Sequence, residues 1–232
     1  GCCALKSNTT AANNTAVGMN SLATNTTGTE NTAMSRDSLS SNTTGNCNVG
    51  VGYRSLKSNT EGNGNVAIGY HALCTSTTAS VNTAVGFCAM ESNTTGGSNT
   101  ALGTNTLQAN TTGTDNTAVG RSAMVKTTTG LCNTAMGGNT MACNTTGCYN
   151  SAFGRDALCA NTTADDNTAV GVSALKVNTT GCCNTAVGKD SMALNTTGHS
   201  NTAVGIASLD SNTSGTVNQA FGRRSLCSNT TG

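Results

Sequence analysis

The chain contains no proline and no tryptophan, and only 3% of its 232 residues are aromatic and 9% charged. Globular domains usually carry about 25% charged residues, so neutral polar side chains must cover most of this surface. A core built from so few aromatic rings is thin, and the apolar 35% of the chain consists mainly of Ala, Val and Leu. The composition therefore favours a narrow core that is repeated many times over one large core.

The chain also lacks an excess of charge of either sign. Its net charge is +1, and its acidic and basic residues are scattered singly. A protein that binds nucleic acid normally needs a basic stripe that releases counterions from the phosphates, and this chain has none. No apolar run approaches the roughly 20 residues of a membrane-spanning helix. We therefore expect neither a nucleic-acid partner nor a membrane span.

What the chain does contain is a 17-residue repeat without insertions or deletions. An Asn recurs at this interval at Asn14, Asn31, Asn48, Asn65, Asn82, Asn99, Asn116, Asn133, Asn150, Asn167, Asn184, Asn201 and Asn218. Counted from this Asn as position 1, the consensus reads N-T-A-V-G-x-x-[A/S]-L-x-x-N-T-T-G-x-x. Self-similarity at a fixed period is typical of a repeat architecture. The repeats at both ends are partial, so we expect the chain to be a segment of a longer fibre.

The residue types of the repeat favour strands over helices. Each repeat holds two glycines, and each Gly costs a helix about 1 kcal/mol. Short segments such as Thr-Ala-Val suit a strand. We therefore predict an all-β fold, a β-solenoid (β-roll or β-helix) with one 17-residue coil per repeat, and a single repeat domain over residues 1–232. About 14 coils would stack at a spacing of about 4.8 Å, with equivalent side chains in ladders.

Two positions of the repeat are candidates for the core, because position 4 is always apolar and position 9 is always Leu or Met. The expected core ladders include Val17, Leu22, Val85, Val119, Val170, Leu175, Val187, Met192, Val204 and Leu209. Position 3 is Ala in every repeat except one, which has Gly50. Since neighbours in a strand point to opposite sides, we expect the Ala file to face a second crowded surface.

A second chain, or a narrow part of the same coil, would supply that crowded surface. Two large buried side chains per coil stabilise it by roughly 4 to 6 kcal/mol, which is less than the conformational entropy cost of ordering 17 residues. Association of several chains would help to close this gap. We therefore predict a parallel homotrimer.

The repeat, as in residues 167–183, resembles the shaft repeats of tail-fibre proteins from bacteriophages, large viruses and some bacteria. It is also similar to the shorter head repeats of trimeric autotransporter adhesins. The likeness covers essentially the whole chain, with Ser35, Ser76 and Thr127 as departures from the consensus. The self-cleaving chaperone domain that often follows such shafts has no counterpart here, so its activity is not carried over.

The resemblance implies a function as well as a fold. It implies a non-catalytic fibre shaft or adhesin stalk, extracellular or at a virion surface, that spaces a receptor-binding tip for attachment. The partners that it implies are further copies of the chain, in a trimer or filament, and a host-surface receptor bound by other segments.

Cysteine is abundant, with 12 residues, all at variable positions of the repeat. Cys143 and Cys159 fall on consecutive coils, as do Cys132 and Cys148. The Cα atoms of such neighbours should lie about 5 to 6 Å apart, within reach of a disulfide, and cross-coil disulfides would suit an extracellular fibre. The alternative is that Cys is only a small residue tolerated at the surface. No His stands at a ligand spacing from these residues, so we expect no metal and no cofactor.

Position 12 creates a series of N-glycosylation sequons, at Asn8, Asn25, Asn42, Asn93, Asn110, Asn144, Asn161, Asn178, Asn195, Asn212 and Asn229. If these side chains point outward in a secreted chain, the result is a glycosylated extracellular fibril. If they point inward or cap a turn, the sequons are a by-product of an Asn ladder. Ser76 and Thr127 break the sequon but keep a small polar residue, which favours the structural role. The Thr file at position 13 leaves a further alternative, an ice-binding solenoid.

An enzyme has the least support. His71 and His199 are isolated, Asp165 and Asp166 form a surface pair, and no nucleophile, base and orienting acid recur together. The glycine-rich segment at residues 62–67 looks like a loose dinucleotide-binding fingerprint, but the repeat accounts for each of its residues. We predict no enzymatic activity and assign no catalytic residue.

Overall fold

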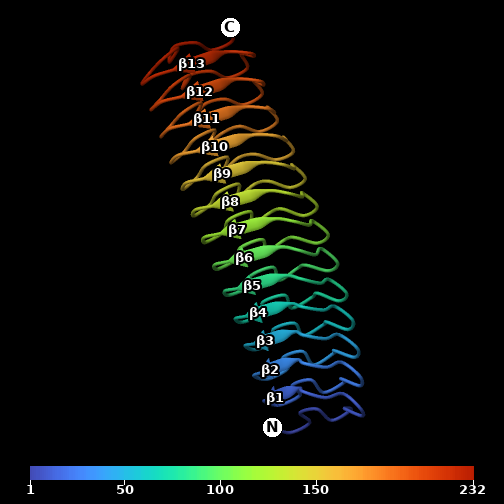
Figure 1. Ribbon diagram of the computed structural model, residues 1–232. Coiled ribbons are helices and arrows are strands. Elements are labelled where there is room, and N and C mark those ends of the chain that lie inside the picture. Colours follow the sequence, from blue (N-terminus) through green and yellow to red (C-terminus); the bar gives the residue numbers. More distant parts are fainter. The chain divides into compact units, whose positions relative to one another are not determined.

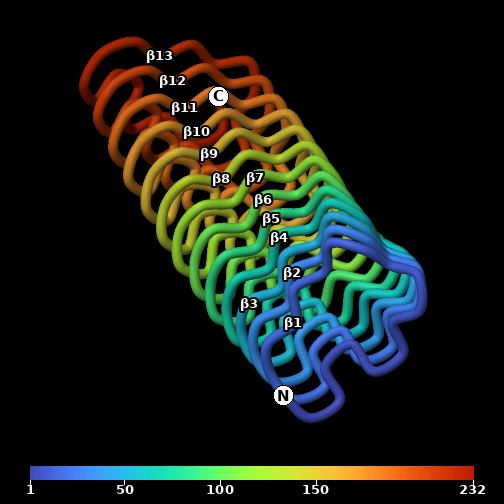
Figure 2. The backbone as a smooth tube through the Cα atoms, turned by 60° about the horizontal axis from the view of Figure 1, so that its bottom comes forward, coloured from blue at the N-terminus to red at the C-terminus, as the bar shows by residue number.

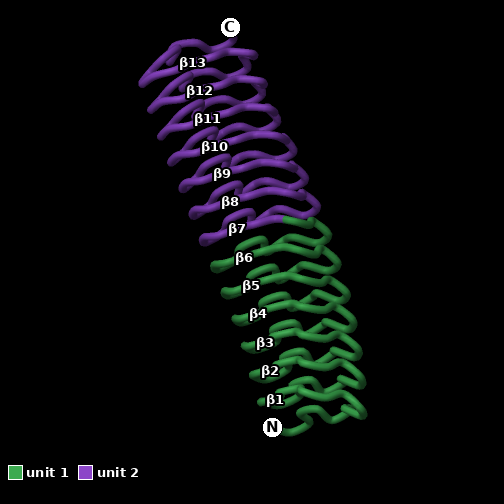
Figure 3. The backbone as a smooth tube through the Cα atoms, viewed as in Figure 1, with its two compact units in different colours: residues 1–115 green, residues 116–232 purple.

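The computed structural model describes all 232 residues and contains strands and turns but no helix. It comprises two compact units, residues Gly1–Asp115 and residues Asn116–Gly232 (Figure 3). The strands of unit 1 are β1 (Thr15–Val17), β2 (Thr32–Met34), β3 (Val49–Val51), β4 (Val66–Ile68), β5 (Thr83–Val85) and β6 (Thr100–Leu102). Those of unit 2 are β7 (Thr117–Val119), β8 (Thr134–Met136), β9 (Ser151–Phe153), β10 (Thr168–Val170), β11 (Thr185–Val187), β12 (Thr202–Val204) and β13 (Gln219–Phe221).

Within each unit, every strand pairs in parallel with the strand one repeat later (Figure 1). The register is in phase with the repeat, so that Ala16 lies beside Ala33 in unit 1 and Ala186 beside Ala203 in unit 2. Successive turns of a unit follow nearly the same outline, one above the other (Figure 2). The prediction of an all-β solenoid with one 17-residue coil per repeat is confirmed. The single domain over residues 1–232 and the homotrimer stay predictions.

Backbone hydrogen bonds join each turn to both of its neighbours, outside the strands as well as within them. The N–H of Leu39 donates to the carbonyl of Ser55 in the following turn at 3.0 Å. The N–H of Asp37 donates to the carbonyl of Met19 in the preceding turn at 2.9 Å. The three-residue strands therefore do not hold the 17-residue turns in register alone, because backbone groups elsewhere in each turn are also paired between turns.

The apolar part of the interior is formed by the side chains of positions 3, 8 and 9. The Leu or Met of position 9 is the largest fully buried side chain of a turn, and Leu22, Leu175, Met192 and Leu209 are all fully buried, as predicted. Burial of each such side chain stabilises the fold by about 1.5 to 3 kcal/mol. Met replaces Leu in several turns at little cost, because the two side chains have similar volumes.

The prediction for position 4 was wrong, because its side chains point outward. Val17 is 55% exposed, and Val170 and Val204 are also exposed, while Val85, Val119 and Val187 are half-buried. The Ala of position 3 points inward instead and is fully buried from Ala33 onward.

The reason for this orientation is the narrow interior beneath the strand. At Gly50, which replaces the Ala, a Cβ atom would lie 2.5 Å from the Ser38 Oγ atom and 3.4 Å from the Leu39 Cδ1 atom. This space accepts at most a methyl group. Of the two crowded surfaces expected for the Ala file, the structure shows the narrow part of the same coil, and the second chain is not the surface that this file faces.

Sharp bends occur where the backbone takes positive φ angles. Left-handed residues recur at positions 7, 9 and 17, for example Asp37 (φ 58°), Leu39 (φ 50°) and Cys47 (φ 57°). The glycine that follows every strand except β2, where Ser35 stands (φ 120°), has φ angles such as 143° at Gly86. Only glycine adopts this last conformation without strain.

The two neighbouring glycines Gly137 and Gly138 provide a test of this constraint. Gly137 has a φ of 138°, and a Cβ on it would lie 2.7 Å from the Gly154 carbonyl carbon and 2.8 Å from the Thr140 Oγ1 atom. Gly138 has open space around its Cα atom. Gly137→Ala should lower the free energy of unfolding by more than about 2 kcal/mol, through backbone strain and overpacking.

Gly138→Ala is the matched control and should leave stability unchanged or raise it by up to about 1 kcal/mol. Urea unfolding followed by circular dichroism measures both variants. Equal effects of the two substitutions would contradict the assignment of strain to position 5.

Candidate functional site

The surface has no pocket, and no three His, Cys, Asp or Glu side chains lie together as a metal site would need. No segment forms a helix of the length and hydropathy that crossing a bilayer requires. Two surface features stand out: an apolar file on the outer side of the strands, and a group of aromatic rings at the bend that follows three strands of unit 1.

The first feature is the outward file, which we define as the position-4 side chains of the strands. Its exposed members in unit 1 are Val17, Met34, Ile68 and Leu102, and in unit 2 Met136, Phe153, Val170, Val204 and Phe221. The half-buried Thr of position 2 lies on the same side of the strand, since alternate residues share a face. Contiguous exposed apolar side chains of this kind mark interaction surfaces.

The polar part of the interior is formed by two ladders of buried Asn side chains. In the position-1 ladder, the Asn48 N–H and Nδ2 groups donate to the Asn31 Oδ1 atom at 3.0 and 3.1 Å. In the position-12 ladder, the Asn42 Nδ2 group donates to the Asn25 Oδ1 atom at 2.8 Å. Where the ladders are uninterrupted, each Asn thus satisfies the Asn of the neighbouring turn.

The two ladders meet at the backbone carbonyl of position 15. The carbonyl of Gly45 accepts from the Nδ2 group of Asn31 at 2.8 Å and from that of Asn42 at 3.0 Å. A Cβ on Gly45 would lie 2.5 Å from the Asn42 Oδ1 atom and 2.5 Å from the Gly62 carbonyl oxygen. Ala164 occupies the same position in another turn, and its carbonyl also accepts from two Asn side chains, so the contact does not require Gly.

The burial of position 12 contradicts the N-glycosylation sites for nine of the eleven sequons. The fully buried ones are Asn25, Asn42, Asn93, Asn110, Asn144, Asn161, Asn178, Asn195 and Asn212. Only Asn8 and Asn229 are half-buried, and their Nδ2 groups donate to the carbonyls of Ala11 and Gly232. A glycan is attached through Nδ2, and in the folded chain this group points inward and is engaged in hydrogen bonds. The inward alternative for the sequons is the one that the structure supports.

All twelve cysteines are free thiols in the structure. The N–H of Cys143 donates to the carbonyl of Cys159 at 2.9 Å, so this pair lies on adjacent turns, as the repeat predicts. The Cys148 thiol donates to the carbonyl of Thr146 at 3.2 Å. Neither the Cys143–Cys159 nor the Cys132–Cys148 disulfide is formed, and oxidation of these pairs stays a prediction.

The Thr file at position 13 is engaged in hydrogen bonds between turns. The Thr26 hydroxyl donates to the carbonyl of Thr43 at 3.1 Å, and the Thr43 hydroxyl donates to that of Thr60 at 3.0 Å. The Thr of position 14, such as Thr27 and Thr44, is the exposed one. These hydroxyl contacts add to the joining of turns and are part of the fold.

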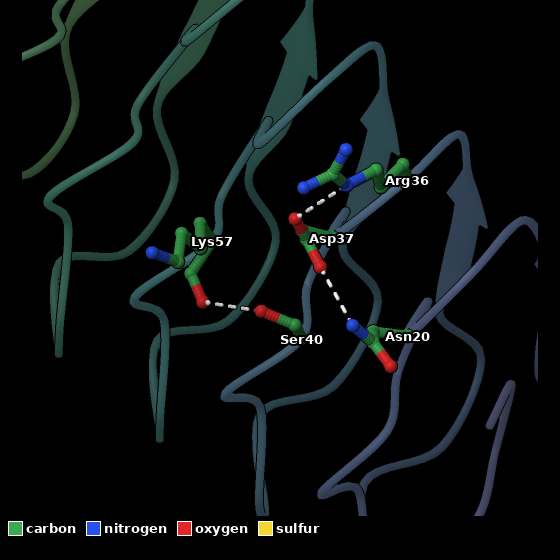
Figure 4. Close-up of polar contacts among 5 residues, drawn as sticks. All are labelled: Asn20, Arg36, Asp37, Ser40 and Lys57. Carbon is green, nitrogen blue, oxygen red and sulfur yellow. Dashed lines mark hydrogen bonds and ion pairs between the residues drawn. The ribbon is translucent and has the colours of Figure 1, made fainter.

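Charged groups at positions 6 and 7 pair with their neighbours. Figure 4 shows the Arg36 Nε atom 3.3 Å from the Asp37 Oδ2 atom, and the Asn20 Nδ2 group donating to Asp37 Oδ1 at 2.9 Å. In the same view the Ser40 hydroxyl lies 3.5 Å from the carbonyl of Lys57. The Asp37 carboxylate is therefore in contact with Arg36 of its own turn and with Asn20 of the preceding turn.

The second surface feature is the aromatic strip, which we define as Tyr53, Tyr70, His71 and Phe87. The rings of Tyr70 and Phe87 are stacked, with centroids 5.1 Å apart and planes 7° apart, and the Tyr53 and Tyr70 centroids are 5.4 Å apart. His71 stacks on Tyr70 at 4.1 Å. The guanidinium of Arg54 lies 5.0 Å from the Tyr53 centroid, a cation–π distance.

Sequence reasoning did not find this strip, although a signal for it was present. Tyr53, Tyr70 and Phe87 all occupy position 6, 17 residues apart, in a chain with only six aromatic residues. In a solenoid, equal positions of successive turns are neighbours in space. The variable positions form columns just as the recurring ones do, and the column of position 6 contains the strip.

Glu91 connects the strip to the next turns. Its Oε1 atom lies 3.0 Å from the His71 Nδ1 atom, and its Oε2 atom accepts from the Gln108 Nε2 group at 3.0 Å. Burial raises the pKa of Glu91, but the hydrogen bonds from Gln108, His71 and Cys88 lower it by more. The pKa of Glu91 therefore lies below its ordinary value. Burial and the nearby Glu91 carboxylate raise the pKa of the Cys88 thiol to about 11.

The other titratable residues noted in the sequence are not brought together. The His199 Nδ1 atom lies 3.3 Å from the hydroxyl of its neighbour Ser200. The Asp165 carboxylate accepts from the N–H of Cys148 at 2.7 Å. No catalytic group is assigned to either.

Comparison of the chain with protein-family models, with curated proteins and with solved structures finds no match.

The Asn ladder of position 12 is interrupted at Ser76, and this break leads to a stability prediction. The Ser76 hydroxyl and the Asn59 Oδ1 atom are both buried without a hydrogen-bond partner, because the serine side chain is too short to span the turns. In Ser76→Asn, the new Nδ2 group should reach Asn59 Oδ1. The free energy of unfolding should rise by about 1 to 3 kcal/mol, the cost of a buried unsatisfied group.

Ser92→Asn makes the same chemical change at an exposed position and serves as the control. Its stability should stay within about 0.5 kcal/mol of the parent, as for most surface substitutions. Thermal or urea unfolding measures both. A loss of stability in Ser76→Asn that exceeds the effect of the control would show that position 12 does not work as a ladder.

The lowered pKa of Glu91 predicts a pH dependence of stability. A carboxylate whose pKa is lower in the folded state stabilises the fold at pH values above its unfolded-state pKa, and this contribution is lost as the pH falls through the folded-state pKa. The melting temperature should therefore fall as the pH is lowered from about 5 to about 3. In Glu91→Gln this fall should be smaller.

Glu61→Gln is the control, since the Glu61 side chain is exposed. Its melting temperature should follow that of the parent over the same pH range. If Glu91→Gln and the parent lose stability in parallel, the contacts with His71 and Gln108 do not stabilise the ionised carboxylate.

Proposed function

We propose that the chain is a shaft segment of a fibrous attachment protein, a tail-fibre shaft or adhesin stalk that is not an enzyme. Each 17-residue repeat adds one turn, and each turn is bonded to its immediate neighbours. In such a repeat architecture, length grows in proportion to the number of repeats. This property supports a role as a spacer between a base and a receptor-binding tip.

The observation that carries the proposal is the outward file. Every strand of both units presents an apolar side chain on its outer side, next to a Thr or another residue of position 2. Covering one half-exposed side chain of this size contributes roughly 1 kcal/mol, so the seven strands of unit 2 offer roughly 7 kcal/mol. This is of the same order as the estimated cost of association.

A parallel homotrimer is the assembly that we propose for this surface. The file would lie at the contact between chains, and the repeat resembles those of trimeric fibres and adhesins. The contact is thus made by the Val side of the strand, whereas the sequence alone pointed to the Ala side. An extracellular or virion-surface location, and a host receptor bound by other segments, are supported by the resemblance alone.

The alternative functions have less support. The inward Nδ2 groups of position 12 speak against a fibril coated with N-glycans. For ice binding, a flat and regular face is needed, but the outward file mixes Val with larger side chains such as Met34 and Phe153. The position-13 hydroxyls are engaged in hydrogen bonds to backbone carbonyls. On that side of the turn a single file of Thr side chains, that of position 14, is therefore exposed to water.

Charged substitutions in the outward file test the proposed assembly. In the double variant Ile68→Lys with Val85→Lys, two ammonium groups per chain would enter the contact between chains, where their desolvation is unfavourable. Sedimentation velocity should show a trimer for the parent and monomers for the variant. Both side chains point outward, so the circular dichroism spectrum should not change.

Thr78→Lys with Thr95→Lys adds the same charge at exposed position-14 sites and is the control. This variant should remain a trimer. A parent chain that is monomeric at all concentrations, or a Lys variant of the outward file that assembles like the parent, would overturn the trimeric shaft.

A further inference from the structure

The aromatic strip has no part in the proposed shaft, whose contacts come from positions that recur in every turn. Position 6 does not need an aromatic side chain, since Thr104 occupies it in the turn after Phe87. In unit 2 the same position is Arg, Gly, Val, Lys or Ile. The strip nevertheless exposes large rings, with Tyr70 44% and Phe87 52% exposed. A surface of this kind on one unit only is a candidate for recognition.

The stacking of the rings determines which of their atoms a ligand can reach. Because Tyr70 lies against both Tyr53 and Phe87, its faces are partly covered, and ring edges remain accessible. The phenol hydroxyls of Tyr53 and Tyr70 are in no hydrogen bond that the structure shows. The edge of an aromatic ring carries the positive part of its quadrupole. The strip thus presents positive edges and hydroxyl donors, which suit a ligand rich in oxygen atoms.

The same stacking disfavours single-stranded nucleic acid as the ligand. Proteins that bind single strands offer free ring faces on which successive bases stack, along a groove of basic residues. Here the rings stack on one another, and the chain has a net charge of only +1.

The charges beside the strip indicate the sign of the ligand. Arg36 is paired with Asp37, and the Glu91 carboxylate is in contact with the His71 ring and the Gln108 amide. Arg54 and Lys57, three residues apart in one turn, make no ion pair with any carboxylate. The planar guanidinium of Arg54 is suited to bind a carboxylate through two parallel hydrogen bonds.

From this geometry we propose that the aromatic strip, with Arg54 and Lys57, binds a polysaccharide built from carboxylate-bearing sugars such as uronic acids. The sugar rings lie along Tyr53, Tyr70 and Phe87, whose edges and hydroxyls meet their oxygen atoms. A sugar carboxylate binds at Arg54. This activity goes beyond the role of a spacer and does not depend on trimer formation, because its residues lie outside the outward file.

Binding is tested on the whole chain by isothermal titration calorimetry, with a hexamer of galacturonic acid, a neutral glucose hexamer and a decamer of thymidylate as probes. The parent should bind the acidic hexamer more tightly than the neutral one. The double variant Tyr70→Thr with Phe87→Thr should weaken this binding at least about tenfold, as the loss of aromatic contacts does at other interfaces. Arg54→Asn should weaken the acidic hexamer selectively and reduce its preference over the neutral one.

The substitutions are chosen so that the fold is kept. Thr occurs at position 6 and Asn at position 7 in other turns, for example Thr104 and Asn105. Ile206→Thr removes an equally exposed position-6 side chain from unit 2 and should leave binding unchanged. Sedimentation velocity on the same variants monitors the oligomeric state.

Three results would overturn the proposal. The first is that the parent fails to bind the acidic hexamer, or that the aromatic double variant binds it as tightly as the parent. The second is tighter binding of the thymidylate decamer than of the acidic hexamer. The third is that the double variant changes the oligomeric state and not the affinity, because the strip would then be a contact between chains. The first two results leave the shaft proposal unaffected. The third concerns the assembly as well, and the Lys variants of the outward file then test the shaft proposal separately.

Discussion

The interaction on which each turn depends is the pair of hydrogen bonds that two buried Asn side chains donate to one backbone carbonyl. The carbonyl of Gly45 accepts from Asn31 and Asn42, eleven residues apart, and so ties two sides of the turn together inside the molecule. The remaining polar atoms of these amides bond to Asn residues of adjacent turns. A buried amide that loses its partners costs about 1 to 3 kcal/mol. This network therefore stabilises both the outline of a turn and its register with the next one.

Several features of the repeat follow from this clamp. Because the Asn amides occupy part of a narrow interior, the apolar part has room for one large side chain per turn, together with small side chains. Leu39 supplies the large side chain, and Ala33 and Ser38 are the small ones. The second large apolar residue of each repeat has no place inside and lies on the outer side of the strand. An exposed apolar file is thus a consequence of the polar interior, and it is available for association.

The period of the repeat made the fold class predictable, because identical units of 17 residues can stack in register only if each forms one turn. The orientation of Ala186 and Val187 was not predictable in the same way. Because neighbouring residues of a strand point to opposite sides, these two had to face opposite sides. The larger side chain was expected inside because of its size, and this was wrong. The inner side of a wide sheet holds large residues, whereas a narrow turn that contains two Asn side chains accepts only a methyl group there. The sequons were ambiguous for the same reason, since the direction of Asn42 depends on the carbonyl that it meets.

The aromatic strip shows where recognition can arise in such a chain without disturbing the fold. Side chains at positions 6 and 7 follow the strand-ending Gly and project from the bend, and they contribute no atom to the Asn clamp or to the Leu ladder. We expect their exchange to cost little stability, since position 6 ranges from Gly138 to Tyr70. The stacking of turns nevertheless places these unconstrained residues in columns, so that changes in three successive repeats produce a continuous surface. A repeat that tolerates variation at such positions can therefore acquire a binding site while every contact that defines its turn stays the same.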